Sequence, residues 1–368
     1  MDQRIEKLAQ LLVHYSIRLK KGEMLKIQGE VCTLPLIKAV YKEAVLAGAY
    51  PYTRIVVPDN EESFLKHAKD DQLKFISPME KFEVDKMETL IVIWGSSNTR
   101  YLSGVDPQKQ ALMRSSRSAL IKKMFKRMGD NSLRWCGTLF PVSADAQEAE
   151  MSLKDWEDFV YNAGHMNTDD PAKHWKKISN EQQRLVKILN RIDHLHFQSE
   201  GTDLKMRVKG RKWIECSGRV NFPDGEIFTG PIEDTVEGQI QFSYPAVYMG
   251  RVVENVKLEF KKGKVVKESA GKNQEFLTSM LNMDKGARFV GEIAIGTNYD
   301  ITHFSKNILF DEKIGGTCHL AVGKSIDESG GKNISSLHWD MICDMKEEGQ
   351  IYVDGELIYE KGKFIIEF

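Results

Sequence analysis

The sequence predicts an α/β domain with a parallel sheet over residues 1–190, followed by a mainly antiparallel β (α+β) domain over residues 191–368. The first reason is length, because 368 residues exceed what one hydrophobic core usually organises. The second is that helix-like and strand-like segments alternate in the first half, which is typical of parallel βαβ units. The third is that short strand-like runs bounded by Gly or Asn fill the second half.

In the first half, apolar residues recur at helical spacing over residues 3–19 until a Lys-Lys-Gly sequence ends the run. The other predicted helices cover 34–47, 61–76, 79–87 and 107–128, and the predicted strands are 24–28, 52–57, 89–94 and 133–140. Parallel sheets often bind nucleotides at their carboxyl edge. However, no G-x-G-x-x-G or G-x-x-x-x-G-K-[ST] motif follows these strands. We therefore predict no cofactor-binding residues here, and a domain that shapes a substrate channel or a dimer contact.

The second half begins after a charged helical stretch over residues 151–192, where Trp156, Phe159 and Val160 have the spacing of a buried face. Strands are predicted at 194–198, 203–208, 213–216, 239–242, 252–260, 264–268, 290–295 and 319–322, with three more after 338. One helix is predicted at about 273–283. Hairpin signals at Lys262-Gly263-Lys264 and Asp354-Gly355 indicate antiparallel pairing.

Composition excludes several classes of protein. The formal net charge is -1, with 41% hydrophobic and 29% charged residues, which argues against a nucleic-acid binder and for an ordinary globular protein. The first residues lack the features of a signal peptide, and no apolar run approaches the ~20 residues needed to cross a bilayer. Five cysteines without a C-x-x-C motif do not indicate a disulfide framework. We expect a cytoplasmic protein that binds neither nucleic acid nor membrane.

Ligand-type side chains lie near glycines at the edges of apolar runs in the second half. His338 and Asp340 are two residues apart, so both side chains point to the same face of a strand. His319 follows a Gly-Gly pair, while Glu292 and Glu226 each follow a glycine directly. Imidazole and carboxylate together suit zinc, cobalt or manganese. Three carboxylates and two histidines are enough for two divalent metal ions.

Other arrangements compete with this interpretation. A lone H-x-D is more often a surface ion pair. His194 and His196 form an H-x-H, a common metal signature, but no carboxylate lies at useful spacing and we rank the pair below the five ligand candidates. Cys318 adjoins His319, and the histidine is preferred because adjacent strand residues point to opposite faces. Two metals can hydrolyse amides or phosphate esters, so the residue types alone leave peptidase and phosphatase open.

Four motifs of the chain resemble the thermophilic aminopeptidase T family, which includes aminopeptidase S. They are N-x-P-x-G-E at Asn221–Glu226, G-E at Gly291–Glu292, D-E-K-x-G-G-T-x-H at Asp311–His319, and G-G-x-N followed by H-x-D at Gly330–Asp340. Order, spacing and surrounding residues agree with the family. The resemblance is strong in the C-terminal half and extends to the general layout of the N-terminal half.

The resemblance implies a dinuclear metalloaminopeptidase that releases N-terminal amino acids from short peptides. In such an enzyme one metal takes the free α-amine, the other takes the scissile carbonyl, and a bridging hydroxide attacks. The ligands that the resemblance implies, with Glu292 as the bridge, are Glu226, Glu292, His319, His338 and Asp340. It also implies a homodimer, and a separate domain without a cofactor motif suggests an enclosed site.

The reaction also requires a general base that receives the proton of the attacking water. Glu292 is the first candidate for this role if it bridges the metals only loosely. Glu312 is the second, although a salt bridge to Lys313 or a plain surface position would explain it as well. Lys313 is itself a candidate for stabilising the oxyanion.

One position departs from the family. A tyrosine often stands seven residues after the first histidine, close to the metals, and here that position is Ile326. Tyr299 and His303 are candidates to replace the missing donor, because both follow Glu292 toward the same strand end. The departure keeps open a second hypothesis, a non-catalytic or regulatory metal-binding homologue. The complete set of five ligand candidates argues against it.

Overall fold

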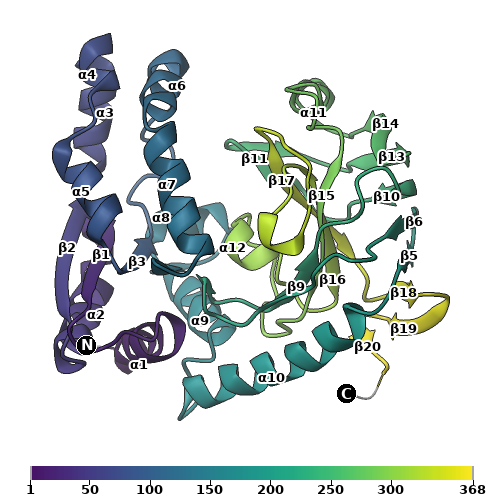
Figure 1. Cartoon of the computed structure of the whole chain (residues 1–368), viewed down its shortest axis with the longest axis horizontal. Helices are drawn as coiled ribbons and strands as arrows, with labels where there is room; N and C mark the ends of the chain where they lie inside the picture. Colours follow the sequence, from purple (N-terminus) through teal and green to yellow (C-terminus); the bar gives the residue numbers. More distant parts are fainter. Residues whose placement is uncertain (1, 367–368) are drawn as a thin grey trace. The chain divides into compact units, whose positions relative to one another are not determined.

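The chain forms two compact units in the computed structural model, which describes residues 2–366. The first unit runs to Ala172 and also takes Gly218–Phe222, and the second takes Lys173–Ser217 and the chain from Pro223 onward (Figure 1). From the sequence, the division was expected at residue 190. In the structure most of helix α10 (Pro171–Leu189) belongs to the second unit, because Leu185 and Leu189 lie in that unit's hydrophobic core.

The first unit is built on one parallel sheet with the strand order β2-β1-β3-β4-β8. Its strands are β1 (Met24–Glu30), β2 (Tyr50–Val56), β3 (Thr89–Trp94), β4 (Arg134–Leu139) and β8 (Asn221–Phe222). The α/β class with a parallel sheet that was predicted for this half is confirmed. The short strand β8 joins the sheet beside β4 although more than 80 residues separate them in sequence.

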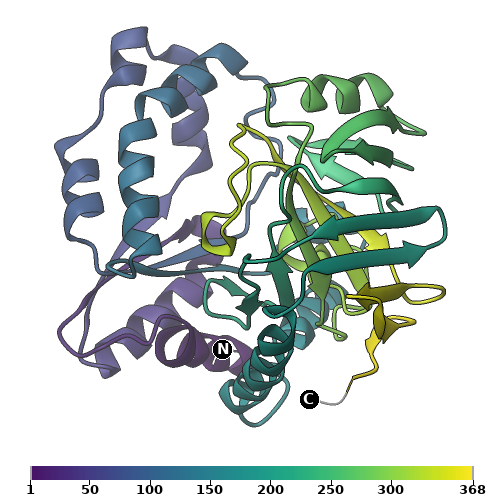
Figure 2. The same ribbon diagram turned by 45° about the vertical axis from the view of Figure 1, so that its right-hand side comes forward.

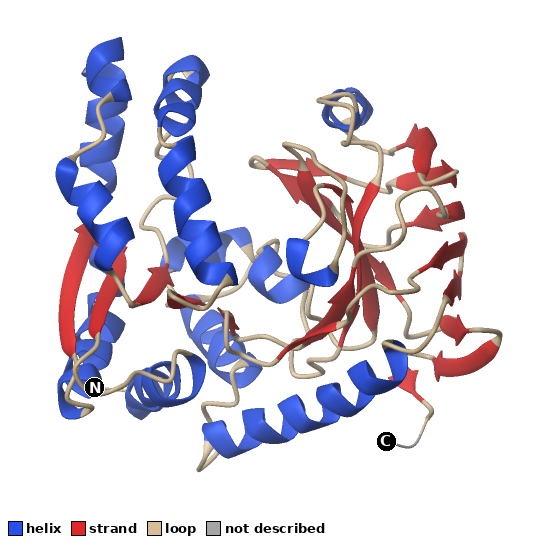
Figure 3. Cartoon of the chain, in the orientation of Figure 1, coloured by secondary structure: helices blue, strands red, loops and turns tan. Residues whose placement is uncertain are grey.

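Helices connect the strands of the first unit (Figure 3). They are α1 (Gln3–Leu11), α2 (Leu34–Leu46), α3 (Pro58–His67), α4 (Asp70–Lys74), α5 (Pro78–Lys86), α6 (Pro107–Ser116), α7 (Ser118–Gly129), α8 (Ser143–Glu148) and α9 (Leu153–Ala163). The helix predicted over 107–128 is divided at Arg117, whose guanidinium donates to the carbonyls of Leu73 and Phe75. In the described part of the chain, no helix is both long and apolar enough to cross a membrane.

The second unit contains antiparallel sheets, as the sequence predicted. One has the order β14-β13-β10-β6-β5-β18-β19-β20, a second has the order β17-β16-β15-β9-β7, and β11 pairs with β12. The strands are β5 (His194–Ser199), β6 (Thr202–Arg207), β7 (Ile214–Cys216), β9 (Glu226–Thr229), β10 (Glu237–Gln241), β11 (Ala246–Tyr248), β12 (Arg251–Val253), β13 (Lys257–Lys261), β14 (Lys264–Ser269), β15 (Val290–Gly296), β16 (Thr317–Gly323), β17 (His338–Asp344), β18 (Gln350–Val353), β19 (Glu356–Glu360) and β20 (Lys363–Phe364). Besides most of α10, the unit contains the helices α11 (Gln274–Leu281) and α12 (Ile308–Asp311). The β5–β6 hairpin is the teal one in Figure 2.

One hydrophobic core takes side chains from both large sheets of the second unit, including Leu195 and Phe197 from β5 and Ile293, Leu320 and Met341 from β15–β17. Burial of each such side chain contributes roughly 1.5–3 kcal/mol. Because side chains alternate between the faces of a strand, the residues between these positions lie on the opposite face of the five-stranded sheet. A shift of register by one residue would exchange the two faces, so the core holds the register.

Candidate metal centre

The opposite face of the five-stranded sheet carries all of the ligand-type side chains singled out in the sequence. Their strands and positions are Glu226 at the start of β9, Glu292 in β15, His319 in β16, and His338 with Asp340 at the start of β17. Each has a neighbour in the chain whose side chain belongs to the core, for example Ile227 after Glu226. The two-residue period of the strands thus places these five side chains on one face.

Small residues stand between the ligand-type side chains. Glu292, Ala321 and Asp340 are cross-strand neighbours on three adjacent strands. Ala294 is the cross-strand partner of His319. Facing side chains in such pairs have their Cβ atoms only about 4.5–5.5 Å apart. Alanine at both positions therefore leaves space beside the carboxylates and the imidazole.

Two glycines allow the carboxylates to take their places. Strand β15 has an irregularity between Val290 and Glu292, and a Cβ on Gly291 would lie only 2.3 Å from the carbonyl oxygen of Lys324. Gly225 has a φ of +126°, and a Cβ there would lie 2.6 Å from the Cβ of Asn298. Both positions exclude any larger residue. This is the structural reason for the glycine that precedes each glutamate.

The two imidazoles face the carboxylates. His319 Nε2 lies 3.6 Å from Glu226 Oε2 and 3.6 Å from Glu292 Oε1. It lies 3.9 Å from Asp340 Oδ1. His338 Nε2 lies 3.7 Å from Glu292 Oε2 and 3.4 Å from Asp340 Oδ1. These separations exceed ordinary hydrogen bonds but resemble the distance of about 3.4 Å between two tetrahedral zinc ligands with bonds of about 2.1 Å.

Backbone carbonyls orient both imidazoles. His319 Nδ1 donates to the carbonyl oxygen of Glu312 over 2.9 Å, and His338 Nδ1 donates to that of Lys324 over 2.8 Å. A carbonyl only accepts, so each Nδ1 carries a proton, and Nε2 is the ring nitrogen that faces the carboxylates and would bind a cation. Metal-bound histidines show this pattern, in which the second ring nitrogen donates to an outer partner.

Burial makes this group of charges costly without a cation. Glu226 and Glu292 are each 6% exposed, and burial raises the pKa of both carboxyls. Burial by itself would lower the pKa of His319 and His338, but the facing carboxylates outweigh it and raise each to about 10. Glu226 Oε2 is buried and accepts no hydrogen bond from the described residues. A divalent cation would satisfy this oxygen, so the residues fit a metal site.

Donor atoms also gather in groups that overlap. One oxygen each of Glu292 and Asp340 and a ring nitrogen of His338 lie within 4.8 Å of one another. A second group, with the same limit of 4.8 Å, joins Glu312, His319 and Asp340. The structure therefore brings Glu312, one of the two candidate bases, to the ligand-type residues. The ammonium of Lys313 forms ion pairs with both Glu312 and Glu226.

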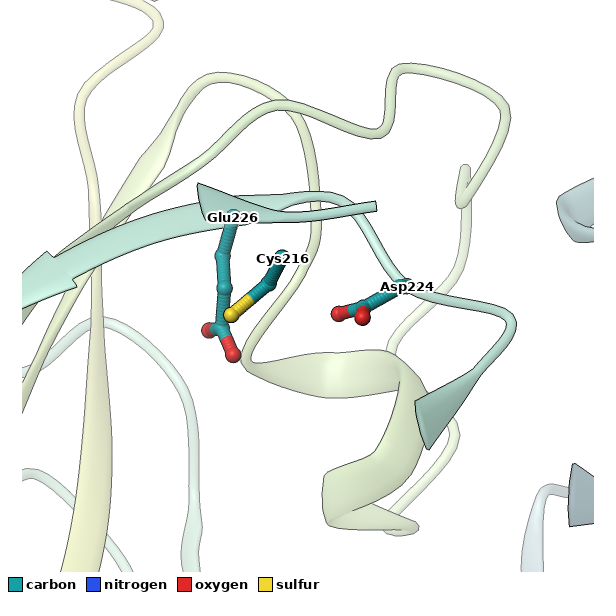
Figure 4. A group of neighbouring side chains, drawn as sticks. All are labelled: Cys216, Asp224 and Glu226. Carbon is teal, nitrogen blue, oxygen red and sulfur yellow. The ribbon is translucent and has the colours of Figure 1, made fainter. Parts of the chain in front are cut away.

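Two residues that adjoin Glu226 were not predicted from the sequence. Cys216 Sγ, a carboxylate oxygen of Asp224 and one of Glu226 lie within 4.8 Å of one another (Figure 4). Asp224 carried a signal, because it lies two residues before Glu226 and such residues share a face in extended backbone. Cys216 carried none, since only the pairing of β7 with β9 places it opposite Glu226.

The remaining candidates have other partners or are more exposed. His194 and His196 lie on β5 of the other large sheet and pair with Asp354 and Asp203 respectively. The hydroxyl of Tyr299 donates to the carbonyl of Gly362 over 2.8 Å. Among the other two, His303 is exposed and Ile326 is half-buried. The Tyr299 hydroxyl is thus engaged away from the ligand-type side chains.

Comparison with known proteins gives consistent results. A profile of the thermophilic metalloprotease (M29) family matches residues 1–364. Aminopeptidase AmpS of Bacillus subtilis is 25% identical over 372 residues, which cover 91% of this chain and 88% of the relative. Aminopeptidase T of Thermus thermophilus is 26% identical, with 98% of this chain and 96% of the relative covered. The solved structure of wild-type AmpT from Thermus thermophilus has the same fold, with a TM-score of 0.85 and 23% identity over 99% of both chains.

Proposed function

The chain belongs to the thermophilic metalloprotease (M29) family and is a metal-dependent peptidase, and from this premise we propose that it releases N-terminal amino acids from short peptides. The names of the relatives support an aminopeptidase, and these relatives align with nearly the whole chain. The observation that carries the proposal is the single sheet face on which two imidazoles point their Nε2 atoms at buried carboxylates. The motif resemblance drawn from the sequence is confirmed by the family match.

We propose two divalent metal ions per chain, of zinc, cobalt or manganese. The residues that would hold them are Glu226, Glu292, His319, His338 and Asp340. Glu292 is suited to bridge them, because its Oε1 faces His319 and its Oε2 faces His338. Bound ions would supply Lewis-acid polarisation of the scissile carbonyl and a water of lowered pKa.

Charge balance supports two ions. Five carboxylates gather here, those of Asp224, Glu226, Glu292, Glu312 and Asp340. The ammonium of Lys313 offsets one of their negative charges. Four negative charges remain among these groups when both imidazoles are neutral, which equals the charge of two divalent ions. Buried charges without partners are strongly disfavoured, and two divalent ions would balance these groups without protonating a carboxylate or an imidazole.

We assign the general base to Glu312. Both oxygens of Glu292 face imidazole nitrogens and are committed to the metal positions in this proposal. The carboxylate of Glu312 lies near His319 and Asp340 and is held by Lys313. Glu312→Gln should lower kcat by about 10²–10⁴-fold while bound metal stays at the wild-type level. Loss of metal from this variant would instead make Glu312 a ligand.

The test of the function combines metal analysis with two substrates. Elemental analysis should find two divalent ions per chain, and leucine or arginine p-nitroanilide should be hydrolysed. Chelation should abolish the activity and added zinc, cobalt or manganese should restore it. Hydrolysis of p-nitrophenyl phosphate alone would point to a phosphatase. A metal-loaded protein that hydrolyses neither substrate would support the regulatory homologue raised by Ile326.

We also propose that the enzyme works as a homodimer with an enclosed site, as the family resemblance implied. An enclosed site admits short peptides and excludes folded proteins, which protects other proteins in a cytoplasmic setting. Sedimentation at micromolar concentration should give twice the chain mass of 42.0 kDa. A fully active monomer, or rapid trimming of a folded protein, would contradict this proposal.

A further inference from the structure

The carboxylates and thiol beside Glu226 have the donor types of a metal site of their own. Cys216 and Glu226 are direct cross-strand partners on β7 and β9, and Asp224 precedes Glu226 by two residues. Figure 4 shows the sulfur of Cys216 next to the Glu226 carboxylate, with the Asp224 carboxylate pointing toward both. One thiolate and two carboxylates would suit zinc, cobalt or cadmium. These buried carboxylates require a cation that compensates their charge.

A lysine supplies a cation at this group. Lys313 is fully buried, and its Nζ lies 3.5 Å from Glu226 Oε1 and also pairs with Glu312. These two carboxylates compensate the burial of the ammonium, so Lys313 is a paired cation inside the protein. Asp224, 2% exposed, belongs to the same group of donor atoms as Glu226.

Asn298 makes two hydrogen bonds that position the backbone of Lys313. The amide of Asn298 donates to the carbonyl of Lys313 over 3.1 Å, and the side-chain amide of Asn298 donates to the carbonyl of Asp224 over 2.8 Å. Asn298 itself is buried, at 3% exposure. One residue thus joins the turn that carries Lys313 to the turn that carries Asp224 and Glu226. These hydrogen bonds fix the backbone position from which the Lys313 side chain reaches the carboxylates.

We propose that Lys313 takes the place of a third metal ion in the Cys216–Asp224–Glu226 group and acts as a positioning residue for the metal centre. By binding Glu226 Oε1 it leaves Oε2, the oxygen without a hydrogen-bond partner, directed at His319. The backbone carbonyl of the preceding residue, Glu312, accepts a hydrogen bond from Nδ1 of His319. Two consecutive residues therefore orient two of the proposed ligands. Because the ammonium is fully buried and paired with two carboxylates, this role replaces the oxyanion role considered from the sequence.

The proposal rests on the two-metal function, and its test uses cobalt as a spectroscopic probe. In the wild-type protein, cobalt should bind as two equivalents without a thiolate-to-cobalt charge-transfer band, since Lys313 keeps the metal away from Cys216. Lys313→Ala removes the ammonium and opens its space. This variant should bind a further equivalent of cobalt with a thiolate band, the thiol proton being released to solvent. The band should vanish in Lys313→Ala/Cys216→Ser.

Kinetics give a second measure of the same role. Outer partners of metal ligands typically contribute 10- to 100-fold in activity or affinity, so Lys313→Ala should lower kcat by about that factor. Lys313→Arg, which keeps the positive charge, should recover part of kcat and show no thiolate band. A Lys313→Ala protein with wild-type kcat and no thiolate band would overturn the proposal, as would a thiolate band in the wild-type protein.

Two further measurements keep the outcome decisive. If Lys313→Ala does not fold, Cys216→Ser in the otherwise wild-type chain still tests the assignment, because its bound metal should remain at two equivalents. Loss of one equivalent from Cys216→Ser would overturn the proposal by making the thiol a native ligand. Wild-type protein that binds no metal or cleaves no peptide would count against the proposed function itself, which separates that failure from a failure of the Lys313 assignment.

Discussion

The two large sheets of the second unit each carry two histidines with carboxylates nearby, and the difference lies in how the imidazoles are held. His319 and His338 donate from Nδ1 to backbone carbonyls and face two or three carboxylates with Nε2. On β5, His196 pairs with Asp203 over 2.6 Å and His194 with Asp354 over 3.5 Å, and both aspartates are about half exposed.

The comparison shows that spacing along a strand does not identify a metal ligand. H-x-H and H-x-D both place two side chains on one face of a strand. What distinguishes the second pattern is its surroundings, which supply several buried carboxylates and a fixed acceptor for the other ring nitrogen. An exposed pair of one histidine and one aspartate contributes little to stability and offers too few donors for a metal.

The largest effect should follow from neutralising a carboxylate on the five-stranded sheet. Glu292→Gln removes a charged donor that faces both imidazoles, so bound metal should fall and activity should drop by at least about 10³-fold, equivalent to about 4 kcal/mol. Asp340→Asn should act in the same way. The matched control is Asp203→Asn on the eight-stranded sheet, which removes the same charge from the partner of His196. Normal activity in Glu292→Gln would remove the two-metal interpretation.

A smaller effect, on the pH dependence of stability, is expected from Asp311. This buried carboxyl accepts hydrogen bonds from Ser305, whereas the carboxylates described above face imidazoles. Asp311 is 2% exposed, and both the backbone amide and the hydroxyl of Ser305 donate to its Oδ1. Burial raises the pKa of Asp311 from 3.8 to about 7. The folded state therefore holds this proton more tightly than the unfolded state. The stability that Asp311 contributes is complete below about pH 4 and is lost as the pH rises through about 7.

Asp311→Asn keeps the accepting oxygen for Ser305 and removes the titration. Denaturant unfolding should show that the variant gains stability relative to wild type between pH 5 and pH 8, by roughly 3 kcal/mol. Asp203→Asn again serves as the control, because its carboxylate is on the surface. A stability difference between Asp311→Asn and wild type that does not change with pH would show that Asp311 stays ionised in the fold.

The smallest effect is expected for the histidines of the eight-stranded sheet. His194→Ala/His196→Ala should leave bound metal per chain unchanged and alter the free energy of unfolding by no more than about 1 kcal/mol, because both ion pairs are exposed. Metal analysis and denaturant unfolding check the two parts. If one metal equivalent disappears, the site has been placed on the wrong sheet.

Much of the fold was predicted from local patterns of the sequence, and the errors of that prediction have physical causes. The alternation of helix and strand predicted the parallel sheet, and short apolar runs predicted the antiparallel ones. The helix predicted over 107–128 is broken at Arg117, whose guanidinium donates to carbonyls of a distant segment. Similarly, the predicted strand 252–260 is divided into β12 and β13, which belong to different sheets. Both divisions lie where the chain contacts segments distant in sequence, which a local pattern does not show.

The sequence by itself determined the fold class, the family and which strand residues share a face, because period-two alternation and glycine positions are local properties of the chain. For this reason the pattern of residues offers Glu292, His319 and Asp340 as candidate ligands. Only the tertiary structure decided that Lys313 lies fully buried among Glu226 and Glu312, and that Cys216 lies opposite Glu226. The physical reason is that burial of a charge depends on partners from other segments. A lysine in a charged stretch has no local mark of the buried carboxylates around it.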